Sequence, residues 1–525
     1  MPITEILKQN AVKFGNDVAL VELDPENAIR KEITWSEFDK EANRFANYLM
    51  SRGIKKDNKV AILMTNSIRW LICYFGVLKT GALSVPLNFR YDTADIKNCL
   101  AISEADALVF GGEFIERLEP LKEQISTLKV AVCTACELTP DYAVSYCDAI
   151  KNASENDPLV PLTDEDDAAL YFTSGTTGFP KAILHDHLSL MTACITENKH
   201  HSQTKEDTFL CIPPLYHTGA IMHWFGSFLV GGKGVLLKGI KPKNIIKAVS
   251  DERATIVWLL VPWAQDILDS IDSGDIVLSD YELSQWRLMH IGAQPVPPSL
   301  IHRWLITFPN HQYDTNYGLS ESIGPGCVHL GVENVDRVGA IGVPGYNWQA
   351  KIVLPDMTEA SRGVAGELAV KGNGVMKCYY KNPEATAESL KDGWLLTGDM
   401  AYMDDDGFIY LVDRKKDLII TGGENIFPVE IENFLRQHDK IKDVGVIGLP
   451  HERLGEIVAA VIEIKDGMTA TEEEMTAFCE GLPRYKRPRK YFFDKVPRNP
   501  TGKIEKVVLR ERYCSDTLVN AQLKR

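Results

Sequence analysis

The sequence predicts a layered α/β protein with more than one domain. Helical and extended patterns alternate over residues 34–86 and again over residues 208–260, and such alternation is typical of sheets covered by helices. The chain has 525 residues, of which 45% are hydrophobic and 25% are charged, so it can bury a sizeable core. Because this length exceeds that of one compact unit, we expect two or more domains.

The first α/β repeat opens with a helix. Residues 34–37, Thr-Trp-Ser-Glu, form the pattern of a capping box, and the apolar residues that follow fall on one helical face before Gly53. Residues 60–63 then predict a short buried strand, which is followed by a helix over 68–79 and a strand over 83–86. This order predicts an α/β layer near the N-terminus.

The pattern changes in the second half of the chain. Residues 366–410 contain short apolar runs separated by Gly, Asn and Asp, which predicts short strands joined by turns. The acidic run at 404–407 has the chemistry of a turn, since the later ligands of a calcium-binding loop are missing. Further along, a helix beginning near Pro428 and strands over 444–449 and 457–464 predict a compact α+β segment.

Charge and hydropathy limit the partners and the location. The formal net charge of -15 argues against a nucleic-acid or anionic-membrane partner, and the basic residues within 484–490 are typical of a solvated face. No apolar stretch is long enough to span a bilayer, and residues 1–20 lack the apolar core of a secretory signal. We therefore expect a cytoplasmic protein without an integral membrane segment. Its oligomeric state is left open, with a homodimer as one option.

Residues 171–181, Tyr-Phe-Thr-Ser-Gly-Thr-Thr-Gly-Phe-Pro-Lys, place hydroxyl groups, glycines and one lysine directly after an apolar strand pattern. Gly175 and Gly178 free the backbone so that its N–H groups can turn toward anionic oxygens, and Lys181 adds a positive charge. A Walker loop would need its lysine directly between a glycine and a Ser or Thr, whereas here Phe-Pro separates the last glycine from the lysine. Such a composition also occurs in surface turns, but the order of the whole segment favours a polyphosphate-binding loop.

This loop resembles the signature loop of the adenylate-forming superfamily, which includes acyl-CoA synthetases, adenylation domains of nonribosomal peptide synthetases and firefly-type luciferases. Three further segments resemble other motifs of that superfamily in the same order: residues 317–321, residues 397–399 together with 413–417, and residues 500–503. The resemblance covers essentially the whole chain, with its weakest support over residues 1–150.

The resemblance implies a specific two-domain organisation. A large multi-layer α/β domain, with stacked sheets, helices and a small β-barrel-like part, is expected over residues 1–413. A small, mobile α+β lid is expected over residues 417–525, joined by a hinge at residues 414–416 in which Lys416 is the pivot. Such a lid would present a different face to the site in each of two reaction steps.

The activity that the resemblance implies is that of an acid-thiol ligase. A carboxylate is a poor electrophile, so ATP first converts it to an acyl-adenylate with release of pyrophosphate, and coenzyme A then displaces AMP to give acyl-CoA. The first step brings two anions together and needs positive charge. Lys503 matches the catalytic lysine of that step, Glu321 matches the magnesium-associated glutamate, and His217 is expected to gate the acid pocket or touch the acid. A surface lysine and a buried structural histidine remain the alternatives for Lys503 and His217.

The remaining candidate residues are expected to bind ATP, Mg²⁺ and coenzyme A. In the resemblance, Asp399 and Arg414 fix the ribose, Tyr317 offers an aromatic face to adenine, and Gly423 lines the tunnel for the pantetheine arm. Structural ion pairing is the competing interpretation of an Asp or an Arg. The full set comprises Thr173, which is also expected at the magnesium ion with Glu321, and Ser174, Gly175, Thr176, Thr177, Gly178, Lys181, Gly292, Ala293, Gln294, Asn316, Tyr317, Gly318, Ser320, Asp399, Arg414, Gly422, Gly423 and Glu424.

The acceptor of the acyl group is predicted by what one segment lacks. Residues 214–219, Pro-Leu-Tyr-His-Thr-Gly, contain no aspartate of the kind that pairs the amino group in nonribosomal adenylation domains, so an amino acid would leave its ammonium group unpaired. Coenzyme A is therefore the expected acceptor. A stand-alone enzyme that loads a carrier protein, luciferase chemistry, and a non-catalytic nucleotide-binding protein on the same scaffold remain the alternatives.

The acid itself is only partly constrained. Gly318 occupies the place where short-acid enzymes of the superfamily carry a bulky aromatic residue, so an acyl group larger than acetyl should fit. Met222, Trp224, Trp258 and Trp263 belong to segments expected to wall the acyl pocket, or simply to the core. Those segments offer no lysine or arginine to a second carboxylate. We expect a monocarboxylic acid with an apolar body, either medium-chain or cyclic and aromatic.

Overall fold

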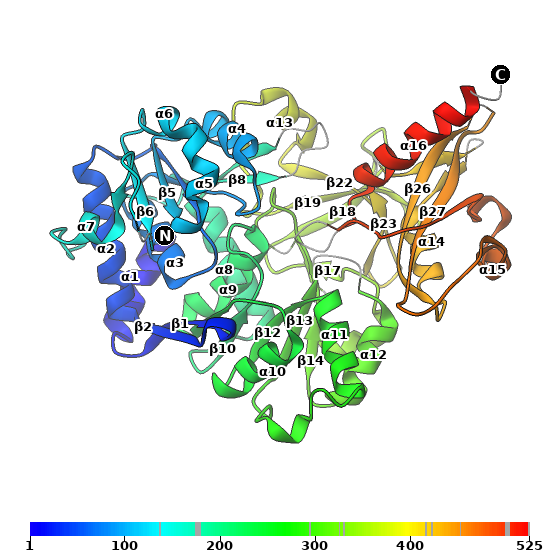
Figure 1. The fold of residues 1–525 in the computed structure, drawn as a ribbon, viewed down its shortest axis with the longest axis horizontal. Coiled ribbons are helices and arrows are strands. Elements are labelled where there is room, and N and C mark those ends of the chain that lie inside the picture. Colours follow the sequence, from blue (N-terminus) through cyan, green and yellow to red (C-terminus); the bar gives the residue numbers. More distant parts are fainter. Residues whose placement is uncertain are drawn as a thin grey trace.

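The computed structural model describes residues 1–135, 138–173, 180–292, 296–324, 326–328, 331–414, 417–421, 424–451, 453–498 and 504–522. Within these ranges the chain forms two large sheets with helices between and around them, then smaller sheets, and finally a separate C-terminal sheet (Figure 1). No helix of the described residues is long and apolar enough to cross a membrane.

An eight-stranded sheet forms the first large layer. Its strands β4, β3, β5 and β6 run parallel, whereas β8 and β9 form an antiparallel pair beside them. Apolar side chains of α4 (Thr93–Ser103), α5 (Ile115–Leu118) and α6 (Lys122–Ile125) pack on one face. In sheet order the strands are β20 (Cys378–Tyr379), β9 (Lys181–Asp186), β8 (Asp167–Thr173), β4 (Leu83–Pro86), β3 (Lys59–Leu63), β5 (Ala107–Gly111), β6 (Val130–Thr134) and β7 (Val144–Ser145).

A seven-stranded sheet forms the second large layer. Its neighbours from β14 to β1 are all parallel, and in such α/β sheets ligands bind outside the carboxyl ends of the strands. Helices α10 (Pro242–Asp251), α11 (Val261–Asp272) and α12 (Pro298–Thr307) cover one face. In sheet order the strands are β14 (Gln312–Asp314), β13 (Leu288–Gly292), β12 (Ile256–Leu260), β10 (Thr208–Cys211), β11 (Lys233–Leu237), β1 (Val18–Asp24) and β2 (Ile29–Thr34).

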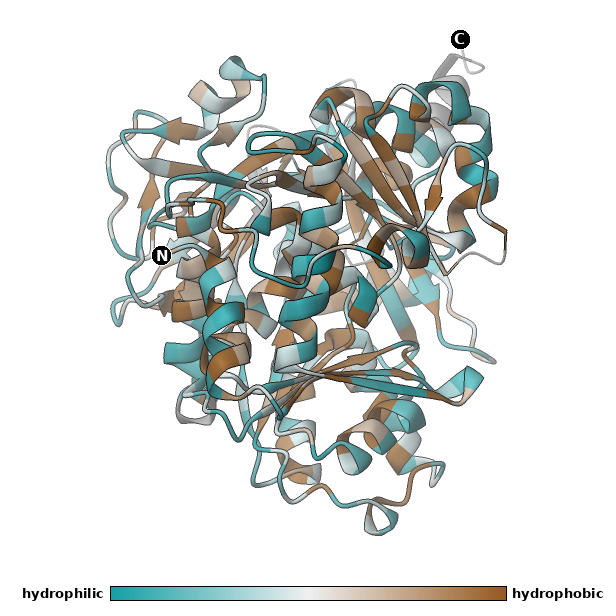
Figure 2. Ribbon diagram, turned by 90° about the vertical axis from the view of Figure 1, so that its left-hand side faces the viewer, coloured by the Kyte–Doolittle hydropathy of each residue, from teal (hydrophilic) through white to brown (hydrophobic). Residues whose placement is uncertain are grey.

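The helices between the two sheets share one hydrophobic core with strands of both. Trp35, Trp70 and Trp224 are among the largest side chains that this core buries completely. Figure 2 shows the consequence: the strands are largely hydrophobic, and the outer helices carry hydrophilic residues along their exposed faces. The helices that contribute to this core are α1 (Ile3–Lys13), α2 (Trp35–Ser51), α3 (Ile68–Lys79), α7 (Tyr146–Ile150), α8 (His187–His201) and α9 (Thr218–Val230).

Smaller sheets complete the chain. The first two contain β15 (Asn316–Tyr317), β16 (Cys327–Val328) and β17 (Val343–Pro344), and then β18 (Gln349–Val353), β19 (Gly366–Lys371), β22 (Trp394–Met403), β21 (Leu390–Lys391) and β23 (Ile409–Arg414), with α13 (Pro383–Ser389). The C-terminal sheet contains β25 (Glu424–Ile426), β24 (Ile419–Thr421), β27 (Gly455–Ile464), β26 (Ile441–His451) and β28 (Lys490–Phe493), with α14 (Pro428–Leu435), α15 (Glu472–Phe478) and α16 (Lys506–Gln522). The C-terminal strands and helices have cores of their own.

The predicted α/β fold class is confirmed, and local signals placed several elements. The side chain of Thr34 accepts a hydrogen bond from the backbone N–H of Glu37, and the Glu37 carboxylate accepts one from Thr34, which is the predicted capping box of α2. The acidic run ends in a turn at Gly407, whose φ is +91°. Helix α14 begins at Pro428, as the sequence predicted.

Candidate active site

The two ends of the candidate polyphosphate loop lie opposite each other. Strand β8 ends at Thr173 and β9 begins at Lys181, and these two residues are register partners in the antiparallel pair. Directly opposite residues have Cβ atoms about 5 Å apart. Residues 174–179, which contain the predicted Ser174 to Gly178, lie outside the described part of the chain. The strand pair therefore fixes where the loop leaves and re-enters the sheet.

Tyr379 links two of the predicted site residues. Its hydroxyl group donates a hydrogen bond of 2.9 Å to Oε1 of Glu321, and Nζ of Lys181 lies 4.5 Å from the centre of its ring. Burial, and then the neighbouring Glu321 carboxylate, raise the pKa of Tyr379, so that its hydroxyl remains protonated and a donor. Lys181 and Glu321, which come from distant parts of the sequence, thus meet at one aromatic side chain.

A cavity of about 230 Å³ adjoins this contact. It reaches from Glu321 and Tyr379 to Thr397 and Gly398, where Gly398 adopts a φ of +72° and its N–H group donates to Glu367 over 3.0 Å. The lining residues are Leu319, Glu321, Glu367, Tyr379, Glu388, Ser389, Leu395, Leu396, Thr397 and Gly398. Two of the motif segments singled out in the sequence therefore border the same cavity.

Tyr317 and Asp399, predicted for adenine and ribose, are in direct contact. The Tyr317 hydroxyl donates a hydrogen bond of 2.5 Å to Oδ2 of Asp399, and both side chains are buried. Burial, and then the Asp399 carboxylate, raise the pKa of Tyr317 well above its usual value. Asp399 in β22 is the register partner of Arg414 in β23, so the two predicted ribose residues occupy neighbouring strands.

A buried histidine holds the segment that contains Gly318 and Ser320. Nε2 of His185 in β9 donates a hydrogen bond of 2.7 Å to the carbonyl oxygen of Ser320. Burial lowers the pKa of His185 to about 4, so the imidazole is neutral near pH 7. This bond ties the segment to the same strand that carries Lys181.

Gly292 and Asn316 lie side by side at the carboxyl edge of the seven-stranded sheet. Gly292 is the last residue of β13, and a Cβ atom there would lie 3.9 Å from the carbonyl oxygen of Asn316. Nδ2 of Asn316 donates a hydrogen bond of 3.2 Å to Oε1 of Glu197 in α8. The side chain of Asn316 is therefore directed toward the helices between the sheets.

His217 forms the N-cap of α9 and is partly exposed. Its ring lies 4.3 Å from that of Tyr216, measured between ring centres. Two residues later, a Cβ atom on Gly219 would lie only 3.0 Å from the ring of Trp258, so the first turn of α9 packs closely on β12. His217 thus lies at the N-terminal end of α9, beside the contact of this helix with β12.

Several predicted residues lie outside the described structure. They are Ser174, Gly175, Thr176, Thr177, Gly178, Ala293, Gln294, Lys416, Gly422, Gly423 and Lys503. Arg414 and Glu424 are placed by their backbones, as the last residue of β23 and the first of β25. The roles of all these residues remain predictions.

Comparison with known families accounts for most of the chain. Residues 7–380 match the AMP-binding enzyme family, and residues 430–503 match the AMP-binding enzyme C-terminal domain. The chain belongs to the AMP-binding enzyme family. The resemblance to adenylate-forming enzymes that the motifs indicated is thereby confirmed.

Named relatives span almost all of the chain. It is 30% identical to a long-chain-fatty-acid–CoA ligase, FadD13, from Mycobacterium tuberculosis, over 97% of this chain and 98% of that one. It is 33% identical to a feruloyl-CoA synthase from Amycolatopsis, over 92% and 94% of the two chains. Among solved structures, ATP-bound MatB from Rhodopseudomonas palustris superimposes with a TM-score of 0.86 at 27% identity, covering 98% of this chain and 99% of that chain.

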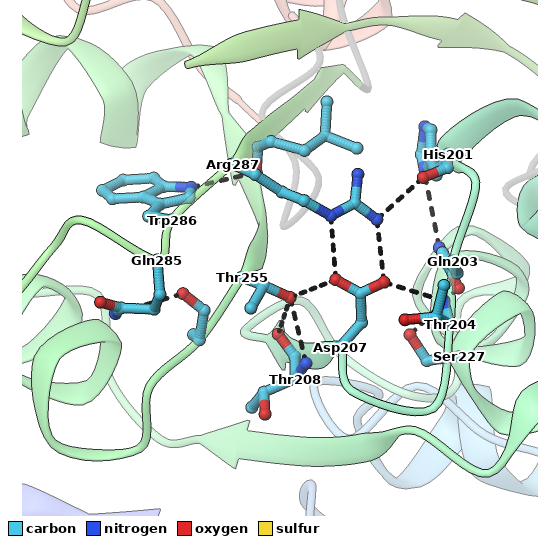
Figure 3. A network of polar contacts seen from close by, with 12 residues as sticks. His201, Gln203, Thr204, Asp207, Thr208, Ser227, Thr255, Gln285, Trp286 and Arg287 are labelled. Atoms are coloured by element: carbon cyan, nitrogen blue, oxygen red, sulfur yellow. Dashed lines mark hydrogen bonds and ion pairs between the residues drawn. The ribbon is translucent and has the colours of Figure 1, made fainter. Parts of the chain in front are cut away.

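A polar network that the sequence analysis did not predict lies at the amino ends of the strands in the seven-stranded sheet. Figure 3 shows Asp207 between Arg287, Thr255 and Thr204, with four hydrogen bonds of 2.6–2.9 Å to its two carboxylate oxygens. Arg287 also donates to the carbonyl oxygen of His201 at the end of α8, over 2.8 Å. This network fixes the loops that precede β10 and β13, and we assign it a structural role in the family fold.

Tyr379, His185 and Glu197 were also missed. Tyr379 is one aromatic residue in a two-residue strand, and His185 and Glu197 are single polar residues within apolar elements. No local motif marks them in a single sequence, because their contacts with Glu321, Ser320 and Asn316 join residues more than 50 positions apart along the chain. Only the packed fold identifies their contacts.

Proposed function

We propose that this enzyme is an AMP-forming acyl-CoA synthetase. It would convert a carboxylic acid and ATP to an acyl-adenylate and pyrophosphate, and then transfer the acyl group to coenzyme A. The observation that carries this proposal is the meeting of Lys181 and Glu321 at Tyr379, beside a cavity that also reaches Thr397 and Gly398. A cation, a hard carboxylate ligand and the ribose-binding segment are the groups that an adenylate-forming site requires.

The residues around Glu321 fit a magnesium ion. Tyr379 donates to Oε1 of Glu321, which fixes the carboxylate and leaves its other oxygen available as a hard ligand of the kind that Mg²⁺ prefers. Thr173 would contribute a hydroxyl group from the end of β8. Magnesium would neutralise charge on the phosphate oxygens when it is bound.

The first step requires the acid and the α-phosphate to approach each other although both are anionic. Lys181 would hold the terminal phosphates at the edge of the β8–β9 pair, and Asp399 would accept hydrogen bonds from the ribose hydroxyls. Lys503 would place its ammonium group between the two anions, so its charge is needed in this step and not in the transfer to coenzyme A.

The second step would use a different placement of the C-terminal part. We propose a boundary after residue 413, a hinge at residues 414–416 and a lid over residues 417–525. Rotation about Lys416 would remove Lys503 from the site and bring Gly422, Gly423 and Glu424 to the tunnel for the pantetheine arm.

The acid is proposed to be larger than acetate, with a medium-chain, cyclic or aromatic body. The proposed pocket lies between α9 and the seven-stranded sheet. A Cβ atom at Gly292 would meet only ordinary contacts, at 3.9 Å, whereas the ring of Trp258 would lie 3.0 Å from a Cβ atom at Gly219 and would bound the pocket there. The relatives act on acids as different as long-chain fatty acids and ferulic acid according to their names, so the acid has to be found by experiment.

The test measures the two half-reactions separately. Acid-dependent pyrophosphate release with acetate, hexanoate, octanoate, benzoate and cyclohexane carboxylate reports the first, and acyl-CoA formation reports the second. Lys503→Ala should slow the first half-reaction by about 10²- to 10³-fold and leave transfer from supplied acyl-adenylate largely intact. Binding of ATP without pyrophosphate release from any acid would indicate a non-catalytic protein. Acyl-adenylate formation without acyl-CoA would indicate a carrier-protein ligase.

A further inference from the structure

A cluster of buried polar side chains lies behind the candidate site, between helices α8 and α9 and strands β13 and β14. Glu197 and His201 come from α8, His223 from α9, His290 from β13 and Asp314 from β14. Each of these five side chains belongs to a residue that is at most 3% exposed. We refer to them as the acid–histidine cluster.

Only part of this cluster is satisfied by its own hydrogen bonds. Glu197 accepts hydrogen bonds from Nδ1 of His223 and from Nδ2 of Asn316, the latter over 3.2 Å. By contrast, both ring nitrogens of His290 are buried without a hydrogen-bond partner among the described residues. A buried polar group left unpaired destabilises the protein. A ligand that pairs these nitrogens would therefore gain from doing so.

The charges of the cluster argue against a ligand that carries a second carboxylate at its distal end. His201 lies between two carboxylates, with Nε2 at 2.8 Å from Asp314 and Nδ1 at 3.4 Å from Glu197. Burial opposes its protonation, but these carboxylates raise the pKa of His201 overall, whereas burial lowers the pKa of His290 well below its usual value. The cluster therefore has no surplus of positive charge with which to pair a second carboxylate.

The position of the cluster connects it to the candidate site. His290 lies two residues before Gly292 on β13, on the same face of the strand and roughly 7 Å away along it. Asn316, which donates to Glu197, directly precedes Tyr317. The ring of His223 lies 4.4 Å from that of Trp258 and 4.0 Å from that of His290, measured between ring centres. The cluster thus lies over the middle of strands β12 to β14, beneath their carboxyl ends and the segments proposed to hold the nucleotide.

We propose that the acid–histidine cluster is the far end of the acyl-binding site, and that it selects a carboxylic acid whose distal end carries a hydroxyl or amino group. This inference rests on the proposed function and narrows its substrate class. The proposed acid keeps an apolar body and carries one polar group at its distal end.

The available hydrogen-bonding groups fit such an end. Nδ1 of His223 pairs with the Glu197 carboxylate, which leaves Nε2 of that ring for another partner, and this nitrogen has no hydrogen bond within the described structure. The indole N–H of Trp258 is a donor that is buried without a partner among the described residues. A hydroxyl group can donate and accept at once, and an ammonium group can donate while the Glu197 carboxylate balances its charge, whereas a methyl group leaves both nitrogens unpaired. A site built in this way discriminates strongly against the analogue that lacks the polar group.

The experiment compares acids that differ only at the distal end. One series is hexanoate, omega-hydroxypentanoate and omega-aminopentanoate, and the other is para-methylbenzoate and para-hydroxybenzoate. In the series whose body the enzyme accepts, kcat/KM for acid-dependent pyrophosphate release should be at least about 10-fold higher for a polar end than for the methyl end. His223→Phe should abolish or invert this ratio. Glu197→Gln should reduce the preference for the amino end more than that for the hydroxyl end, because it removes the negative charge.

His311→Phe is the matched control. His311 is a buried histidine that packs against Trp286 and Phe308 in the other core, and its substitution should leave the ratio of efficiencies unchanged. A methyl preference in the native enzyme, or an unchanged ratio in folded His223→Phe protein, would overturn the proposal. Absence of pyrophosphate release with every acid would instead contradict the proposed function.

A divalent transition metal is the competing occupant. Glu197, His223 and His290 each place one ligand atom within 4.8 Å of the others, and so do His201, His290 and Asp314. Metal analysis of the purified full-length protein decides between the two. We expect no stoichiometric metal; about one zinc, nickel or cobalt ion per chain that is lost in His290→Phe would reassign the cluster and overturn the substrate proposal.

Discussion

Two buried polar networks on the seven-stranded sheet have opposite character, one at the amino ends of its strands and one over their middle. At the amino edge, Asp207 and Arg287 form paired hydrogen bonds, and every carboxylate oxygen of Asp207 has two donors. Over the middle of the strands, Glu197 and His223 are paired with each other, but the ring nitrogens of His290 have no hydrogen-bond partner in the described structure. The same strands therefore support one closed network and one open network.

This difference indicates that the closed network contributes to the stability of the fold, whereas the open network leaves groups available to a ligand. A buried charged group is tolerated when all of its hydrogen-bonding capacity is used within the protein, as it is at Asp207. An unpaired group beneath the strand ends at which α/β sheets bind ligands lowers stability unless a ligand supplies its hydrogen bond. We therefore expect changes in the Asp207 network to affect stability, and changes at the groups of the acid–histidine cluster that lack a hydrogen-bond partner in the described structure to affect mainly the choice of acid.

The largest effect is expected when the closed network is broken. Arg287→Leu should lower the free energy of unfolding by about 3 kcal/mol, because it leaves the buried Asp207 carboxylate without its ion-pair partner. This value is at the low end of what breaking a buried ion pair costs, since the side chain of Arg287 is one-third exposed. Denaturant unfolding measures the loss. Arg303→Leu, which breaks surface ion pairs with Asp269 and Asp272, is the control and should cost less than about 1 kcal/mol. Equal losses would show that the network has no special role.

The contribution of the open network to the free energy of unfolding should depend on pH. Burial alone would raise the pKa of Glu197, but His223 and His201 lower it from 4.5 to about 2. The carboxylate thus stabilises the fold above pH 4.5, and this contribution, up to about 3 kcal/mol, is lost as pH falls toward 2. Between pH 6 and pH 3 the unfolding free energy of the native enzyme should therefore fall more steeply than that of Glu197→Gln. Parallel curves would contradict this assignment.

The same contrast explains what could be predicted from sequence. The loop ends at Thr173 and Lys181, and the pair Tyr317 and Asp399, belong to segments whose composition and order are distinctive, so the sequence alone marks them as candidate site residues. The strands and helices near the N-terminus were marked by local capping and periodicity. Their bounds in the structure differ from the predicted ones by at most a residue or two at the ends.

The contacts that complete the site could not be predicted, for a physical reason. Tyr379 reaches Glu321 across 58 residues, His185 reaches Ser320 across 135, and Asn316 reaches Glu197 across 119. Each of these side chains alone resembles a core or surface residue. Their function comes from tertiary packing, which a single sequence does not report.

A smaller effect is expected at the nucleotide end, where Tyr379 orients Glu321. Tyr379→Phe removes a hydrogen bond to a charged group and should raise the KM for magnesium-bound ATP about 10-fold, which corresponds to about 1.4 kcal/mol. Steady-state kinetics with varied nucleotide provide the measurement. Tyr380→Phe removes a neighbouring hydroxyl that donates to the exposed Glu104, so it should leave this KM unchanged. The same rise in both variants would mean that Tyr379 acts only through the stability of the β20–β9 pair.

The smallest effect is expected at Tyr317, whose hydroxyl donates to Asp399. Tyr317→Phe keeps the aromatic face that is proposed to contact adenine but leaves one oxygen of a buried carboxylate without this donor. We expect a rise of about 5-fold in the KM for ATP, since a single hydrogen bond contributes about 1 kcal/mol and the ribose hydroxyls can take the place of the lost donor. The KM for the acid should not change, because Tyr317 belongs to the nucleotide end and not to the acid–histidine cluster. Tyr74→Phe removes a hydroxyl group of similar burial from the Tyr74–Tyr171 pair between the sheets and serves as the control. If Tyr317→Phe altered the preference among acids as strongly as His223→Phe, the nucleotide end and the acid end would be one coupled network, and the division between them would be wrong.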